Sequence, residues 1–213
     1  MNDFDKVSNF YNFLEKISFG DYLQCFRESL LYKSKSKNIL LIGEGTGNLL
    51  NYFKSFPDSK ITIVESSTKM CEILKIKCID VSDHNISIIN ESFFDFDASI
   101  YYDIICTSFF LDCFSQNDCN LCILKITKLL CVSGHWLNID FYNPKCRSLS
   151  GYYFRFVIRV LFNFFRKTAS LGSSNLPIYS NYSCGNLVLT KKTFSFSPPL
   201  FANLKRKLPL KLC

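Results

Sequence analysis

Three glycines stand at alternate positions directly after a short apolar segment of the chain. The segment is Ile39–Ile42, and the glycines are Gly43, Gly45 and Gly47. Glycine lets the backbone approach a ligand closely because it has no Cβ, and a helix after such a loop offers its N-terminal amides. The spacing is GxGxG. The dinucleotide fingerprint GxGxxG would need a glycine at Asn48, and no GK[S/T] phosphate-loop motif follows.

An acidic residue follows the next apolar segment. Glu65 comes directly after residues 61–64, about 20 residues beyond the glycine loop, where the acidic residue of a nucleotide-binding βαβ unit stands. A carboxylate there accepts hydrogen bonds from both hydroxyls of a ribose. The glycine loop and Glu65 together predict a cofactor of the adenosine type.

The segments that must position these residues show in turn the apolar pattern of a strand and the apolar pattern of a helix. Strands are expected over residues 39–42, 61–64, 86–89, 103–108 and 136–139, and helices over residues 48–56, 67–76 and 118–130. A capping box at Ser115 and Asp118 begins the last helix, and a turn at Ser133-Gly134 precedes the last strand. Residues 187–196 and 200–204 follow as a hairpin split by Pro198-Pro199. We therefore expect an α/β fold, a Rossmann-like open sheet that is mostly parallel, with a C-terminal antiparallel hairpin and helices on both faces.

Length and composition favour one folded domain over residues 1–213. Hydrophobic residues make up 48% of the chain and charged residues 20%, which excludes a disordered chain. Residues 1–36 are expected to form N-terminal cap helices, residues 141–183 a lid-like insertion, and residues 184–206 the terminal hairpin. No apolar run reaches the roughly 18 residues of a spanning helix. The polar start MNDFDK does not suit a secretory signal, so a cytoplasmic location is expected.

Over about residues 4–206 the chain resembles the class I S-adenosylmethionine-dependent methyltransferases, in particular the ubiquinone and menaquinone biosynthesis branch. The opening VSNFYNFLEKISFG resembles that branch's N-terminal cap helices. ILLIGEGTG resembles the family's glycine loop, and VESS resembles the acidic end of its second strand. NESFF stands where the family contacts adenine, and YDIICTSFFLDCF and SGHWLNIDF resemble its fourth and fifth strands.

The resemblance implies S-adenosylmethionine as cofactor and a role for each matched residue. Glycines of the loop lie against the methionine moiety, Glu65 holds the ribose, and Met70 covers adenine. The implied cofactor-binding residues are Tyr11, Gly43, Glu44, Gly45, Gly47, Glu65, Ser66, Met70, Ser92, Phe93, Ser108 and Phe109. Two positions depart from the family pattern, because Leu41 replaces an acidic residue before the loop and Ser92 replaces an aspartate near adenine. Glu44 is expected to replace the first in part, as a partner for the cofactor's ammonium group.

Methyl transfer from a sulfonium needs alignment more than it needs catalytic side chains, so the catalytic residues are hard to identify. Asp112, Asp140 and Tyr142 stand at or beyond the ends of strands four and five and are candidates to act as a base or to orient the acceptor. Each can equally have a structural role. His135 stands at the beginning of its strand, far from such a site, and is expected to be structural.

The segment from Tyr152 to Phe165 is apolar with interspersed arginines and allows three interpretations. It forms a lid over an apolar acceptor pocket, in which Arg155 and Arg159 meet an anionic substrate group. Alternatively it packs on the core with its arginine stems reaching solvent, or it lies on a membrane as a basic amphipathic helix. Residues 141–213 hold 12 Lys and Arg and no Asp or Glu, whereas residues 1–140 hold 13 basic and 18 acidic residues. This asymmetry suits an anionic substrate, an anionic membrane surface or nucleic acid, and equally a basic face that is merely solvated.

The favoured function is methyl transfer to a small lipophilic or anionic metabolite. A non-catalytic module with the same fold and an RNA methyltransferase are the alternatives. Nucleic acid is disfavoured as a partner because Ser108-Phe109-Phe110-Leu111 replaces the Asn-Pro-Pro-Tyr type of motif that methylates bases. No metal site is expected, because Cys119-x-x-Cys122 has neither a second such pair nor a nearby histidine.

Overall fold

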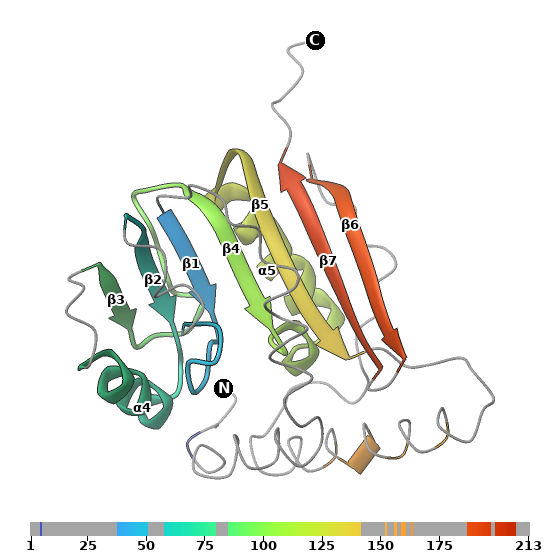
Figure 1. The fold of residues 1–213 in the computed structure, drawn as a ribbon, viewed down its shortest axis with the longest axis horizontal. Helices are drawn as coiled ribbons and strands as arrows, with labels where there is room; N and C mark the ends of the chain where they lie inside the picture. The colour runs from blue at the N-terminus through green and yellow to red at the C-terminus, as the bar shows by residue number, and fades with distance from the viewer. Residues whose placement is uncertain are drawn as a thin grey trace.

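The computed structural model describes residues 5, 38–50, 58–79, 85–141, 152, 156, 159, 160, 163, 187–196 and 199–207 (Figure 1). The predicted cap helices lie outside the described residues except for Asp5. The predicted insertion lies outside them except for residue 141 and five helical positions. Of the helix predicted over residues 48–56, only residues 48–50 are described.

The strands and helices alternate along the chain, as the apolar periodicity predicts. Their bounds are β1 Asn38–Ile42, β2 Lys60–Val64, α4 Thr68–Ile79, β3 Ile86–Ile89, β4 Tyr102–Ser108, the 3-10 turn η2 Leu111–Cys113, α5 Gln116–Leu129, β5 Leu130–Phe141, β6 Leu187–Phe196 and β7 Pro199–Lys207. The five predicted parallel strands and the helices predicted over 67–76 and 118–130 are thereby confirmed, with small shifts in their ends.

The strands form one sheet in the order β3-β2-β1-β4-β5-β7-β6 (Figure 1). All pairings among β1 to β5 are parallel, and β7 pairs antiparallel with both β5 and β6. The chain builds outward from β1 through β2 to β3, then crosses to β4 on the other side of β1. Ligands of open α/β sheets bind at the carboxyl ends of the strands where the order reverses in this way. The sheet order therefore places a candidate site at the ends of β1 and β4.

The middle of the sheet is buried on both faces. Ile39, Leu40, Leu41 and Ile42 of β1 are all 1% exposed or less. Successive side chains of a strand point to opposite faces, so both faces are covered. Leu40 and Ile42 belong to a core cluster with Cys119, Cys122, Ile123 and Ile126 of α5. Two-sided burial explains why the strands read as continuous apolar runs.

The beginning of β5 differs from the prediction. The strand begins at Leu130, directly after α5, where the sequence predicted a start at Trp136. Leu130 pairs with Tyr102, and the next pairing joins His135 to Ile104, so residues 131–134 interrupt the ladder. Ser133 lies within this interruption with a φ of 71°. The predicted turn thus lies inside the strand as an irregularity of its register.

A side-chain cap fixes the start of α5. The Ser115 hydroxyl accepts a hydrogen bond from the Asp118 amide and donates one to the Asp118 carboxylate, at 3.3 and 2.7 Å. The Cys119 thiol donates to the Leu111 carbonyl at 3.1 Å, which ties α5 to η2. The capping signal at Ser115 is therefore confirmed, and it places η2 beside the end of β4.

In the described part of the chain, no helix is long and apolar enough to cross a membrane.

Candidate functional site

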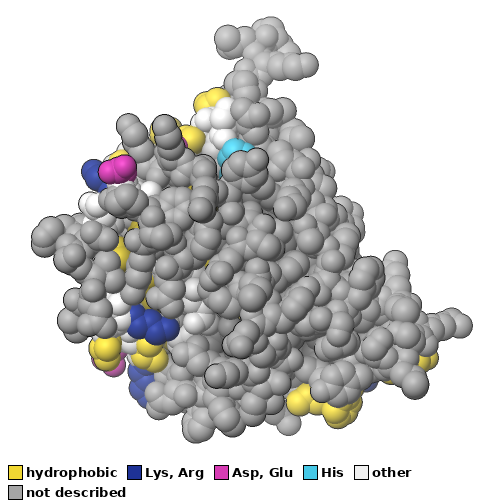
Figure 2. Space-filling view, viewed as in Figure 1, with side chains coloured by type: hydrophobic (Ala, Val, Ile, Leu, Met, Phe, Trp, Pro, Cys, Tyr) yellow, Lys and Arg dark blue, Asp and Glu magenta, His cyan; other side chains and the backbone are white. Residues whose placement is uncertain are grey.

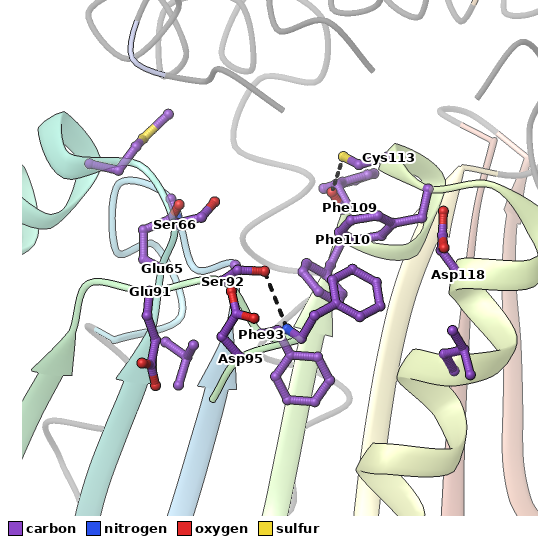
Figure 3. A pocket seen from close by; sticks show the side chains of 17 residues that line it. Glu65, Ser66, Glu91, Ser92, Phe93, Asp95, Phe109, Phe110, Cys113 and Asp118 are labelled. Atoms are coloured by element: carbon purple, nitrogen blue, oxygen red, sulfur yellow. Dashed lines mark hydrogen bonds between the residues drawn. The ribbon is translucent and has the colours of Figure 1, made fainter. Parts of the chain in front are cut away.

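A cavity of about 480 Å³ lies at the carboxyl ends of β1, β2 and β4 (Figure 3). Glu65 and Ser66 at the end of β2 stand on one side of it, and Phe109, Phe110 and Cys113 stand on the other. The lining residues are Gly43, Gly45, Val64, Glu65, Ser66, Met70, Glu91, Ser92, Phe93, Phe94, Asp95, Phe109, Phe110, Cys113, Phe114, Asp118 and Leu121. The cavity is where the sheet order predicts a ligand.

The three glycines of the loop serve different purposes, although all have a positive φ. A Cβ added to Gly47 would lie 2.8 Å from the Leu74 Cδ2, so this glycine allows the loop to pack against α4. A Cβ on Gly43 would lie 2.6 Å from a carbon of the Phe110 ring. At Gly45 the nearest atom would be the Met70 sulfur at 3.8 Å, an ordinary contact. Gly43 and Gly45 line the cavity, whereas Gly47 does not.

Glu65 joins the glycine loop to the end of β2. One carboxylate oxygen accepts a hydrogen bond from the Gly45 amide at 3.0 Å, and the other accepts one from the Ser67 amide at 2.9 Å. The side chain is 5% exposed, and burial raises its pKa above the usual value for glutamate. Each carboxylate oxygen has a second acceptor site, so Glu65 holds the loop and still has capacity for hydroxyl donors.

Glu44 holds the far side of the loop. Its Oε1 accepts hydrogen bonds from the amides of Leu49 and Leu50, at 2.5 and 3.1 Å. Such a carboxylate satisfies amides at the start of a helix, which otherwise lack partners. The Lys77 ammonium donates to the Thr46 carbonyl from α4. The structure therefore shows Glu44 supporting the loop, and Glu44 is not among the residues that line the cavity.

Asp5 contacts the edge of the site, although no motif in the sequence predicts this contact. Its carboxylate accepts hydrogen bonds from the Ser67 hydroxyl at 2.5 Å and from the Lys69 amide at 3.2 Å. These contacts, the Ser67 hydrogen bond above all, lower the Asp5 pKa. Ser67 itself caps α4, because its hydroxyl accepts from the Met70 amide at 3.2 Å. Met70 is 1% exposed and lines the cavity beside this cap.

Aromatic side chains form the wall opposite Glu65. The Phe110 ring meets the rings of Phe93 and Phe114 edge to face, with centroids 5.9 and 4.9 Å apart. The ammonium of Lys125 lies 5.3 Å from the centroid of Phe93. The Ser92 hydroxyl accepts from the Phe94 amide at 3.3 Å (Figure 3). This wall offers flat apolar faces with few polar groups.

Phe109 takes a strained conformation at the end of β4. Its φ is 51°, which is rare for an aromatic residue. Its amide donates to the Ile139 carbonyl at 2.8 Å, and this bond fixes the turn against β5. Strained residues cluster at functional sites. Ser108, directly before it, is 9% exposed and does not line the cavity.

The two acidic candidates for catalysis are both buried. Asp112 is 7% exposed and Asp140 is fully buried. Burial raises the pKa of Asp112 to about 6, and it raises the pKa of Asp140 well above the usual value for aspartate. The Cys113 thiol donates to Asp112 Oδ1 at 3.4 Å and to the Phe109 carbonyl at 3.5 Å. Cys113 lines the cavity, whereas the two aspartates do not.

The structure thus gathers most of the predicted cofactor residues and separates a few. Eight of them line one cavity, namely Gly43, Gly45, Glu65, Ser66, Met70, Ser92, Phe93 and Phe109. Glu44, Gly47 and Ser108 are not among the residues that line it. Tyr11, Tyr142 and Arg155 lie outside the described residues, and Arg159 is an exposed helical residue. Phe110, Phe114 and Cys113 also line the cavity and were not predicted, because their only signal was the aromatic-rich segment after β4.

No group of three or more His, Cys, Asp or Glu side chains in the described ranges is arranged to hold a metal ion. Cys119 and Cys122 are buried on α5, and neither forms a disulfide. His135 pairs with Ile104 near the beginning of β4, at the end of the sheet away from the cavity.

No family model matches the sequence, and no curated protein matches it either. Solved structures do match in fold. Mitomycin 7-O-methyltransferase MmcR has a TM-score of 0.66 at 12% identity, over 96% of this chain and 60% of its own. N-methyltransferase NodS from Bradyrhizobium japonicum WM9, solved in complex with S-adenosyl-L-homocysteine, has a TM-score of 0.58 at 14% identity, over 89% of this chain and 87% of its own. TnmH has a TM-score of 0.71 at 11% identity, over 92% of this chain and 56% of its own.

These identities are too low to transfer a substrate or a reaction. The chain also spans 60% of the length of MmcR and 56% of the length of TnmH. The narrower resemblance to the ubiquinone and menaquinone branch is not supported by these structures and stays a prediction. The sheet order, the cavity at its switch point and the matching structures together show that the chain has the fold of the class I S-adenosylmethionine-dependent methyltransferases.

Proposed function

We propose that the protein is an S-adenosylmethionine-dependent methyltransferase that acts on a small molecule. The observation that carries the proposal is the cavity between Gly43 and Gly45 of the loop, Glu65 of β2 and the aromatic wall after β4. Its volume of about 480 Å³ lies within the range of small-molecule sites. In this proposal the chain is one domain, with residues 1–36 as cap helices, 141–183 as an insertion near the acceptor, and 184–206 as a terminal hairpin.

The residues of the cavity fit the parts of this cofactor. The free acceptor sites on Glu65 suit the two ribose hydroxyls. Phe93 and the buried Met70 offer faces for adenine, and Ser92 offers a hydroxyl beside them. Gly45 lines the cavity, and a Cβ added there would meet no atom nearer than the Met70 sulfur at 3.8 Å, so this position suits the methionine moiety. We assign supporting roles to the residues behind this lining.

Bound S-adenosylmethionine supplies a methyl group that is already activated by its sulfonium charge. The protein's own part is then to align the acceptor and to exclude water. The aromatic wall and the turn at Phe109 are placed to do both, because they close the cavity on the side of β4. The acceptor is proposed to be a lipophilic or anionic metabolite. The aromatic wall supports a lipophilic acceptor. The expectation of an anionic acceptor depended in part on Arg159, and this side chain is exposed.

Replacement of Glu65 tests the cofactor assignment. Hydrogen bonds to a charged acceptor contribute about 1.5–3 kcal/mol each, so Glu65→Ala is expected to weaken S-adenosylhomocysteine binding at least about tenfold. Isothermal calorimetry measures the affinity. Glu72→Ala on α4, an exposed glutamate outside the cavity, is the matched control.

A thermodynamic cycle separates the ribose contact from the hydrogen bond between Glu65 and the loop. Adenosine and 2′-deoxyadenosine are titrated into the wild type and into Glu65→Ala. The missing hydroxyl is expected to weaken binding to the wild type and to have little effect on the variant. If 2′-deoxyadenosine binds more weakly than adenosine by the same factor in the wild type and in Glu65→Ala, the ribose assignment is contradicted. This holds even if Glu65→Ala weakens the binding of both ligands by disordering the loop. Binding of the cofactor without turnover on any acceptor would favour a non-catalytic module.

We also infer that the protein contacts an anionic membrane surface through one helix face. Tyr152, Phe156 and Val160 are helical, lie four residues apart, and are 57%, 66% and 49% exposed. Figure 2 shows exposed apolar side chains along the lower edge of the molecule, where Figure 1 shows the helical positions of this segment. Arg159 is exposed on the same segment, and residues 141–213 hold 12 basic and no acidic residues. Exposed apolar side chains on a helical segment that also exposes Arg159, in a part of the chain rich in Lys and Arg, complement anionic lipid.

A further inference from the structure

The turn that joins β2 to α4 is held by residues from two neighbouring elements. It consists of residues 65–67 and carries Glu65 and Ser66, which line the cavity. The Gly45 amide donates a hydrogen bond to the Glu65 carboxylate at 3.0 Å. The side chain of Asn90, directly after β3, donates to the carbonyls of Glu65 and Ser66 at 3.0 and 3.3 Å. The glycine loop and the end of β3 therefore fix the first two residues of this turn.

The third residue of the turn is held from the beginning of the chain. The Asp5 carboxylate accepts hydrogen bonds from the Ser67 hydroxyl at 2.5 Å and from the Lys69 amide at 3.2 Å. Ser67 is 5% exposed. The hydrogen bond from Ser67 is the main reason why the Asp5 pKa is lowered, so this carboxyl is ionised at neutral pH. Asp5 thus places a charged acceptor at the start of α4, where backbone amides have no partner within the helix.

Ser67 connects Asp5 to residues that line the cavity. The Ser67 hydroxyl accepts a hydrogen bond from the Met70 amide at 3.2 Å, and the Ser67 amide donates one to the Glu65 carboxylate at 2.9 Å. Met70 and Glu65 both line the cavity, whereas Asp5 and Ser67 do not. Asp5 is therefore two hydrogen bonds away from each of these two lining residues, and a displacement of Ser67 would affect both of them.

The charge of Asp5 does not itself favour a ligand on Glu65. Burial is the main cause of the raised Glu65 pKa, and the negative charge of Asp5 adds to it. Asp5 thereby opposes ionisation of the carboxyl that is proposed to accept hydrogen bonds from the ribose. Any benefit of Asp5 to binding must therefore come from its hydrogen bonds. Asparagine separates the two effects, because its Oδ1 can accept the same hydrogen bonds without the charge.

We propose that Asp5 is a positioning residue of the cofactor site. The inference rests on the proposed methyltransferase function and extends the site to the beginning of the chain. Asp5 does not touch the cofactor. It holds Ser67, so that Glu65 and Met70 keep the positions in which they meet the ribose and the adenine. The contact between Asp5 and Ser67 and the binding of the cofactor are therefore coupled, and each strengthens the other.

A purely structural role for Asp5 makes a different prediction. If Asp5 only stabilised α4, its loss would lower the free energy of unfolding and leave the cofactor affinity of the folded protein unchanged. Coupling instead lowers the affinity, and the bound ligand must strengthen the Asp5 contact by the same factor. The Lys69 amide reports on this contact, because it donates to Asp5 from the first turn of α4. Its rate of hydrogen exchange therefore measures how firmly Asp5 is held.

Variants at position 5 test the proposal, with S-adenosylhomocysteine as the ligand in calorimetry. Asp5→Ala is expected to bind it about five- to tenfold more weakly than the wild type. Asp5→Asn keeps both hydrogen bonds and is expected to stay within about twofold of the wild type. Asp58→Ala is the matched control, because Asp58 is an exposed aspartate before β2 that does not line the cavity. In a Ser67→Ala background, Asp5→Ala is expected to lose most of its effect, because the hydroxyl through which Asp5 acts is absent.

An affinity of Asp5→Ala within about twofold of the wild type overturns the proposal, as does an equal loss in Asp58→Ala. Hydrogen exchange of the wild type decides the matter if Asp5→Ala does not fold. The Lys69 amide is expected to exchange at least about fivefold more slowly in protein saturated with S-adenosylhomocysteine. An unchanged exchange rate overturns the proposal. Failure of S-adenosylhomocysteine to bind the wild type would instead contradict the proposed function, because that result does not depend on position 5.

Discussion

Alanine substitutions at two glycines of the loop separate packing from ligand approach. Gly45 and Gly47 have φ values of 61° and 83°. Alanine in this left-handed region costs about 1–2 kcal/mol at either position. The two sites differ in what the new Cβ meets, so the difference between the two variants measures packing alone.

The added Cβ at Gly47 would stand 2.8 Å from Leu74 Cδ2, and Leu74 is fully buried. Overpacking of this kind adds about 1–3 kcal/mol. Gly47→Ala is therefore expected to destabilise the fold by about 2–5 kcal/mol. At Gly45 the nearest atom would be 3.8 Å away, so Gly45→Ala is expected to cost only the backbone term. For a chain of this size each kcal/mol lowers the Tm by about 2–4 °C.

Urea unfolding followed by circular dichroism measures stability, and calorimetry measures S-adenosylhomocysteine affinity. Gly45→Ala is expected to weaken binding more than Gly47→Ala does, because only Gly45 lines the cavity. The reasoning is refuted if Gly45→Ala is the more destabilising variant, or if Gly47→Ala is the variant with the larger loss of affinity.

Two further predictions concern pH and the exposed helix face. Burial raises the pKa values of Asp112, Asp140 and Glu65. Over the pH range between the unfolded and the folded pKa values, the folded protein therefore keeps protons that the unfolded chain has released. The free energy of unfolding is expected to fall as pH rises from about 4 through about 6 for this reason. The Asp112 shift from 3.8 to about 6 contributes up to about 3 kcal/mol; urea unfolding at pH 5 and pH 8 checks this, and a stability that rises over that interval contradicts it. Phe156→Ser is expected to reduce flotation with phosphatidylglycerol vesicles about tenfold, while phosphatidylcholine vesicles bind neither protein. Ile76→Ser, at an equally exposed apolar position on α4, is the control. An equal loss of vesicle binding in both variants contradicts the membrane assignment. Self-association of the wild type through the helix face that carries Phe156 contradicts it as well.

The central strands could be predicted from the sequence because burial on both faces selects apolar residues at successive positions. Ile39, Leu40, Leu41 and Ile42 are apolar in a continuous run because both faces of β1 are covered. The beginning of β5 could not be predicted in the same way. Residues 131–134 leave the ladder, and such an irregularity has no periodicity of its own.

Some residues of the candidate site stand in a local motif, whereas others are brought to the cavity only by tertiary contacts. The glycines and Glu65 belong to one βαβ unit, so their spacing was informative. Phe110 contacts Gly43, which lies far away in the sequence, and nothing in either segment predicts the other. The role of Glu44 toward the cofactor stays a prediction from its position in the loop, whereas its hydrogen bonds with the Leu49 and Leu50 amides could not be predicted from the glycine motif.

The most direct test of the account is a calorimetric titration of the purified protein with S-adenosylhomocysteine, with NAD as the control ligand. The account predicts one site with a Kd in the micromolar range for S-adenosylhomocysteine and no heat of binding for NAD. Binding of NAD alone, or of neither ligand, would contradict the claim that the cavity between the glycine loop and Glu65 is a methyl-donor site.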